Sequence, residues 1–185
     1  EETEQVGEEH MAKDFLNVIE RALMTGISDQ INLLTETGEN IHVFGEFPEV
    51  EELKFPAIIV QHNGSGFEEQ LMGQRASLGS SSGTGEIYGA SYTIHLICEK
   101  ETTIKIDTTG NGTPDTDYKQ RRLLNWLMLN VANSVMDINF DTYEEEDTQV
   151  MERHLNAWGN VGFLPELQWY GASADFMITF TNFRT

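Results

Sequence analysis

The sequence predicts an α+β fold, with two helices packed on one face of a mainly antiparallel sheet. Helical periodicity occurs twice, near the N-terminus and after residue 113, and period-two apolar runs fill much of the remaining chain. Strands and helices do not alternate regularly, which favours helices gathered on one face of an antiparallel sheet. The chain has 185 residues, 39% of them hydrophobic, and this is enough for one packed core.

The first residues are expected to form a flexible arm. Residues 1–9 read EETEQVGEE, with five Glu and almost no apolar side chains. Such a segment cannot offset the entropy lost on ordering. We therefore divide the chain into a flexible acidic arm, residues 1–10, and a single α+β domain, residues 11–185.

The first helix is predicted over residues 12–24. Its apolar residues fall on one face at helical spacing, namely Phe15, Val18, Ile19 and Ala22. Gly26 is the predicted stop, because glycine favours the left-handed conformation that ends many helices. Ser28 and Asp29 are expected to cap a second short turn.

Two strands and a long loop are predicted next. Residues 41–44 form a short strand, followed by an acidic loop that contains Glu46, Glu49, Glu51 and Glu52. Pro56 suits the entry of a strand over residues 57–60, because proline is tolerated at strand starts. Residues 63–85 are rich in Gly and Ser without a period. We expect them to form a long mobile hairpin loop.

The longest strand is predicted over residues 88–99. Apolar residues alternate with polar ones from Tyr88 to Cys98, as in a half-buried strand. Cys98 is the single cysteine, so an internal disulfide is excluded. We expect Cys98 to be a thiol of the core.

A loop over residues 107–117 should lead into the second helix. Thr113 and Pro114 fit a helix start, and Asp115 and Asp117 suit its positive end. An apolar stripe about 100° wide is expected to pack on the sheet. Its members are Leu124, Leu127, Met128, Val131, Val135 and Ile138.

The polar face of this helix is the predicted interface. Trp126 lies among polar side chains there, and an aromatic residue on a polar face is typical of an interface anchor. The alternative is that Trp126 packs beneath the 63–85 loop. The predicted interface residues are Trp126, Arg122, Asn130 and Asn133 on the helix, and Gln70, Leu71 and Arg75 in the loop.

The last quarter of the chain is expected to complete the sheet. Residues 141–147, DTYEEED, are too acidic for a core. Residues 150–155 are predicted as a short strand or turn, and residues 159–165 as a loop. A final pair of strands should turn at residues 171–173, where Gly, Ala and Ser follow one another.

The net charge of −20 restricts the classes of partner that this protein is expected to bind. Only 11 residues are Lys or Arg against 31 Asp or Glu. A nucleic-acid-binding surface would need clustered basic residues, so DNA is not an expected ligand. No apolar run approaches the roughly 20 residues of a membrane span, so no membrane partner is expected.

The sequence gives no reason to predict an enzyme. The five histidines are isolated, and no phosphate-binding or nucleophile motif occurs in a suitable context. We predict no catalytic residues, no cofactor and no metal. Part of a calcium loop is nevertheless present, with Asp107, Thr109, Asn111, Gly112 and Asp115 at suitable positions. Tyr118 replaces its final Glu, so a calcium-dependent binding module is an alternative only.

The order of elements resembles the tail terminator, or tail completion, proteins of long-tailed bacteriophages. The resemblance covers residues 11–185 and rests on the N-terminal helix, the strand after Phe55 and Pro56, the hairpin loop, the long strand, the helix laid across the sheet and the closing strands. It implies a structural virion protein without catalysis.

The resemblance also implies partners. Members of this family form homo-oligomeric rings, here expected to be hexameric, that cap the tail tube and join it to the head–tail connector or stopper. DNA would pass through an acidic lumen without specific binding. The protein would be assembled in the host cytoplasm and located in the tail or neck of the virion. Another neck component is a further alternative, as are a small acidic enzyme and a nucleic-acid mimic.

Overall fold

The computed structural model describes residues 15–35, 41–49, 51–67, 75–78, 81–140 and 148–184. The predicted acidic arm and the acidic segment 141–147 lie outside these ranges. Gln70 and Leu71 of the predicted interface also lie outside them.

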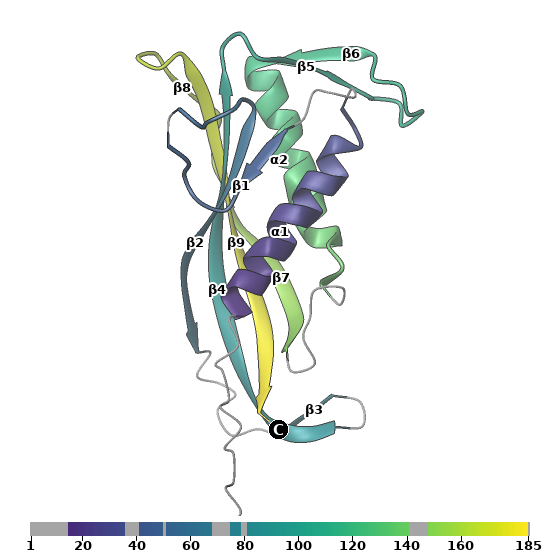
Figure 1. Cartoon of the computed structure of the whole chain (residues 1–185), viewed down its shortest axis with the longest axis vertical. Coiled ribbons are helices and arrows are strands. Elements are labelled where there is room, and N and C mark those ends of the chain that lie inside the picture. Colours follow the sequence, from purple (N-terminus) through teal and green to yellow (C-terminus); the bar gives the residue numbers. More distant parts are fainter. Residues whose placement is uncertain are drawn as a thin grey trace, which may run out of the picture.

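The described residues form an α+β fold, as predicted (Figure 1). The helices are α1 (Phe15–Asn32) and α2 (Gln120–Asp137). The strands are β1 (His42–Phe44), β2 (Ala57–Phe67), β3 (Arg75–Leu78), β4 (Ser81–Glu99), β5 (Thr103–Ile106), β6 (Thr116–Lys119), β7 (Thr148–Trp158), β8 (Gly162–Leu164) and β9 (Trp169–Arg184). Both helices cover the same face of the main sheet, while β5 and β6 form a small separate sheet beside the start of α2.

The main sheet has the order β1-β2-β4-β9-β7, with β3 paired to β4 and β8 paired to β9. Among the described strands of this sheet, β1 and β2 run parallel and the other pairs are antiparallel. Apolar side chains alternate along β4, so Tyr92, Ile94 and Leu96 are buried beneath the helices. Intervening residues such as His95 face the side of the sheet without helices.

The prediction that residues 63–85 form a loop is wrong for the residues described. Strand β2 continues to Phe67, and β4 begins at Ser81 with β3 paired to it. Backbone hydrogen bonds define these pairs, so Gly and Ser can extend a ladder without an apolar pattern. The described parts form an extended ribbon at the opposite end of the sheet from β5 and β6 (Figure 1).

The closing strands also differ from the prediction. No turn occurs at residues 171–173, because Gly171, Ala172 and Ser173 pair with Ile97, Leu96 and His95 of β4 within the continuous strand β9. Residues 150–155 belong to the longer strand β7, which contains two bulges. The predicted loop over residues 159–165 contains the short strand β8.

Helix α1 does not stop at Gly26. It continues to Asn32, and Ser28 lies within it rather than at the start of a second turn. A Cβ atom placed on Gly26 would lie 2.5 Å from Ile138 Cγ1. Glycine therefore allows α1 to approach the end of α2 closely, and this packing role overrides its tendency to end a helix.

Helix α2 starts later than predicted, at Gln120, because residues 116–119 pair with β5 instead. The predicted cap at Thr113 is therefore wrong, and Lys119 is the N-cap without a side-chain hydrogen bond. The predicted apolar stripe is confirmed, since all six of its residues are buried. At the other end of the helix, Arg153 of β7 donates hydrogen bonds to the carbonyl oxygens of Val135 and Met136.

The core lies between the helices and the sheet. Its largest fully buried side chains include Tyr92, Phe176 and several isoleucines of α1 and β2. Cys98 belongs to this core, as expected, and burial raises the pKa of its thiol to about 12. Within the described residues, neither helix combines the length and apolar character that a membrane crossing requires.

Candidate functional site

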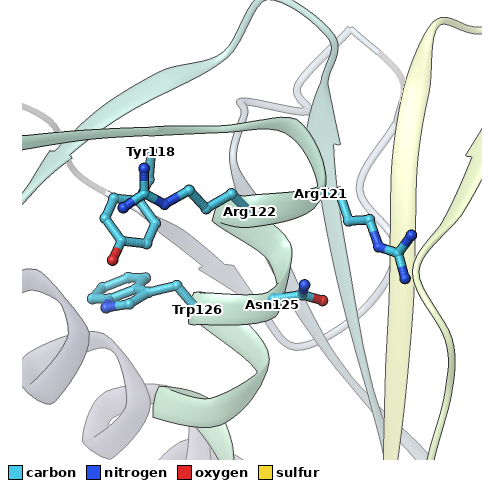
Figure 2. Close-up of a pocket in the computed structure, with 5 residues that line it drawn as sticks. All are labelled: Tyr118, Arg121, Arg122, Asn125 and Trp126. Carbon is cyan, nitrogen blue, oxygen red and sulfur yellow. The ribbon is translucent and has the colours of Figure 1, made fainter.

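An open hollow of about 560 Å³ lies over the first two turns of α2. We call its lining the arginine patch, which consists of Tyr118, Arg121, Arg122, Asn125 and Trp126. Tyr118 comes from β6 and the other four residues from α2. Figure 2 shows Arg122 and the two aromatic rings gathered on one side of the helix, with Arg121 and Asn125 extending on the neighbouring side.

The Arg122 guanidinium lies over the Tyr118 ring, with Cζ 4.1 Å from the ring centroid. The Trp126 ring meets the same tyrosine edge to face, with centroids 6.2 Å apart. Stacking of this kind fixes a long arginine side chain and leaves its N–H donors directed outward. The patch therefore combines a positive charge with a wide aromatic surface.

Trp126 has an intramolecular partner that was not predicted from the sequence. It is half-buried and packs against the core beside Tyr118. The alternative that it packs beneath residues 63–85 is also wrong for the described part of that segment, which lies at the far end of the sheet (Figure 1). Sequence reasoning missed Tyr118 because the predicted helix began before it.

The predicted interface residues do not form one cluster. Arg122 and Trp126 lie together in the arginine patch. Asn130 lies one turn further along α2, and its side-chain amide donates to the Trp126 carbonyl oxygen at 2.8 Å. Asn133 is exposed outside the patch, and Arg75 belongs to β3, where it pairs with Thr84.

The charge of the arginine patch is not neutralised in the described part of the chain. Neither Arg121 nor Arg122 forms an ion pair with a carboxylate there. Asp117 precedes Tyr118 on β6, but strand alternation directs it to the opposite face. Two guanidinium groups that have no carboxylate partner among the described residues are suited to bind carboxylates of another molecule.

A second surface, absent from our predictions, lies on the helix-free face of the sheet. It borders a hollow of about 500 Å³, and we call its aromatic and leucine residues the apolar patch: Phe47, Phe163, Leu164, Leu167 and Trp169. Phe47, Leu164 and Leu167 are each more than half exposed, at 55%, 51% and 53%. A contiguous exposed apolar surface of this kind marks an interaction site in many proteins.

Two segments far apart in sequence build the apolar patch. Phe47 comes from the β1–β2 connection, and its ring lies 5.0 Å from that of His95 on β4. Phe163 comes from β8, and its ring lies 4.7 Å from that of Tyr170. His95 is partly buried here, with Nε2 3.0 Å from Gln61 Oε1, and burial lowers the pKa of its imidazole despite the nearby Asp175.

Four exposed glutamates accompany Phe47 in the β1–β2 connection. We call them the acidic rim: Glu46, Glu49, Glu51 and Glu52. Lys54 is the one basic residue of this connection. The apolar patch is therefore bordered by a net negative charge, opposite in sign to that of the arginine patch.

The Asp107 carboxylate accepts several hydrogen bonds from the loop that follows β5. This carboxylate accepts backbone hydrogen bonds from Thr109, Gly110 and Gly112 at 2.9, 2.7 and 2.6 Å. The Thr109 hydroxyl donates to it as well. A calcium ion at this loop would compete with these internal donors for the same oxygens. Among the described residues, no three His, Cys, Asp or Glu side chains are grouped as metal ligands.

Asp107→Asn is expected to lower the midpoint of thermal unfolding by a few degrees at neutral pH. Burial raises the pKa of the Asp107 carboxyl, but the four hydrogen bonds outweigh it and hold this pKa below the ordinary value. The carboxylate thus stabilises the fold above an ordinary carboxyl pKa of about 4, and this stabilisation disappears as pH falls through the lowered pKa.

The difference between Asp107→Asn and the parent should therefore shrink in thermal melts below about pH 4. Asp117→Asn is the matched control, since Asp117 is exposed and accepts no hydrogen bond from the described residues. Equal losses for both variants, or a loss independent of pH, would contradict the role assigned to Asp107.

Comparison of the chain with protein-family models finds no match, and comparison with curated proteins finds none either.

Proposed function

We propose that this chain is a structural subunit without catalytic activity that assembles into a homo-oligomeric ring. The ring would cap the tail tube of a long-tailed bacteriophage and join it to the head–tail connector. The arginine patch is the observation that supports assembly most directly. It presents Arg122, Tyr118 and Trp126 together, and Arg, Tyr and Trp are the residue types most enriched at the energetic centres of protein interfaces.

The charge of the chain supports the passage of DNA through such a ring. A net charge of −20 repels the phosphate backbone, and the described basic residues give no extended basic surface along which DNA could bind. A lumen lined by such a surface would let DNA slide through without adhering to the wall. Gel-shift measurements should accordingly show no retardation of duplex DNA at physiological salt.

The test of assembly is the mass of the purified protein across the micromolar range. We expect light scattering to show a concentration-dependent species at a whole multiple of 20.9 kDa, six times that mass for the expected hexamer. Negative-stain images should show closed rings, which should bind the ends of isolated tail tubes. A monomer at every concentration, without rings on tail tubes, would overturn the proposal.

A further inference from the structure

We propose that the arginine patch of one subunit binds the apolar patch and acidic rim of a second copy of this chain. This inference rests on the proposed assembly and specifies the two surfaces that meet. The arginine patch offers two guanidinium groups, without an ion pair to any described carboxylate, beside two aromatic rings. The acidic rim offers four exposed carboxylates in the same connection as Phe47.

The two surfaces cannot satisfy each other within one subunit. Phe47 contacts His95, whose neighbours Ile94 and Leu96 are buried beneath the helices, so Phe47 lies on the helix-free face. The arginine patch lies on α2, on the opposite side of the sheet. Figure 1 shows the β1–β2 connection on the left and α2 with β5 and β6 on the right. Contact between the patches therefore requires a second copy.

Charge decides how two copies meet. In a symmetric dimer, a patch that packs on its own copy would set arginine against arginine, or glutamate against glutamate, and like charges that face each other at an interface weaken binding strongly. A two-fold contact could pair the unlike patches only if both lay on one face of the subunit, whereas they lie on opposite sides of the sheet. Head-to-tail contact therefore sets guanidinium against carboxylate in every interface. Such heterologous contacts close into rings or continue as filaments.

The chemistry of the contact matches on both sides. Carboxylates of the acidic rim can accept hydrogen bonds from Arg121 and Arg122, because a guanidinium group can donate two parallel hydrogen bonds to one carboxylate. The exposed ring of Phe47, accessible at 55%, can lie against Trp126 or Tyr118. Each contact alone is small, and together they bury the exposed aromatic surface of both patches.

A charge-reversal experiment tests this pairing. Variant A carries Arg121→Glu and Arg122→Glu, and variant B carries Glu49→Arg and Glu51→Arg. We expect each variant alone to require at least about thirtyfold more protein for half-assembly, because each sets like charges together. An equimolar mixture of A and B should recover assembly, since every interface then pairs opposite charges again.

Controls carry reversals outside both patches. Arg21→Glu and Asp29→Arg alter exposed residues of α1, and both should assemble like the parent. Light scattering measures assembly, and thermal melts verify that every variant is folded.

The outcomes separate the inference from the proposed function. If the parent forms rings that neither A nor B disrupts, or if A and B fail to complement each other, the pairing is wrong and ring assembly stands. A parent that remains monomeric overturns both, and assigns the arginine patch to some other partner.

Discussion

Trp126→Ala is expected to raise the concentration for half-assembly by at least about thirtyfold, since truncation at an interface centre typically costs 2 kcal/mol or more. The substitution also removes the edge-to-face contact with Tyr118 and part of the packing on the core. Truncation of a fully buried Trp to Ala lowers the free energy of unfolding by about 3–5 kcal/mol. Trp126 is half-buried, so we expect a loss of roughly 2 kcal/mol.

The two effects of Trp126→Ala can be separated. Trp126→Phe keeps a ring against Tyr118, so it should recover most of the stability in denaturant melts and only part of the assembly. Leu129→Ala is the control on the same helix, because Leu129 is exposed outside the arginine patch. A folded Trp126→Ala protein that assembles at the concentration of the parent would exclude Trp126 from the interface.

Gly26→Leu is expected to destabilise the fold by about 3 kcal/mol, the upper part of the usual range for overpacking. A Cβ on Gly26 already meets Ile138 Cγ1 at 2.5 Å and Cδ1 at 2.8 Å, and the leucine adds three further carbons at the same contact. Ile138 is buried, so it has little room to move aside. Denaturant unfolding measures the loss.

The double variant Gly26→Leu/Ile138→Ala is the matched test of this cause. Shortening Ile138 makes room for the leucine, so the double variant should lose clearly less stability than the two single losses added together. Strict additivity would show that the clash with Ile138 is not the origin of the loss. A Gly26→Leu variant as stable as the parent would contradict the close approach of α1 to α2.

Gly26 also shows where sequence reasoning reached its limit. Local preference favours a helix end at glycine, whereas the actual reason for this glycine is Ile138, more than 100 residues away in sequence. Thr113 and Pro114 misled in the same way, because pairing of β6 with β5 takes residues that a cap pattern assigns to a helix. Long-range contacts override local signals in both cases.

The parts that were predicted correctly have regular side-chain periods. The alternation along β4 and the apolar stripe of α2 follow from burial on one face, which sequence reveals directly. The ladder through Gly171, Ala172 and Ser173 rests on backbone hydrogen bonds to β4, and side-chain types say little about those. Sequence patterns therefore predicted the layers better than the lengths of the strands.

Some features of the candidate site could be predicted from sequence, and others could not. Arg122 and Trp126 were predicted from their places on α2, and the acidic rim was recognised as an acidic loop. Phe47, within the same loop, lines a hollow with Phe163 and Leu164 because β8 folds beside the β1–β2 connection, and no local pattern signals this. An exposed Phe within a run of glutamates was the one available hint.

The uninterrupted ladder between β4 and β9 makes the main sheet long, so a small rotation at one end displaces the other end by a large distance. The ladder runs from Glu99 and Trp169 to Thr84 and Arg184, about 50 Å at the usual rise per residue. Strand β8 and the start of α2, which carry residues of the two patches, lie toward one end of the sheet, and β3 lies at the other (Figure 1). A tilt of about 5° at the patches would therefore displace the β3 end by about 4 Å over such a length. In the ring proposed above, small differences in how neighbouring subunits dock would therefore move the β3 ends further than the docking surfaces themselves.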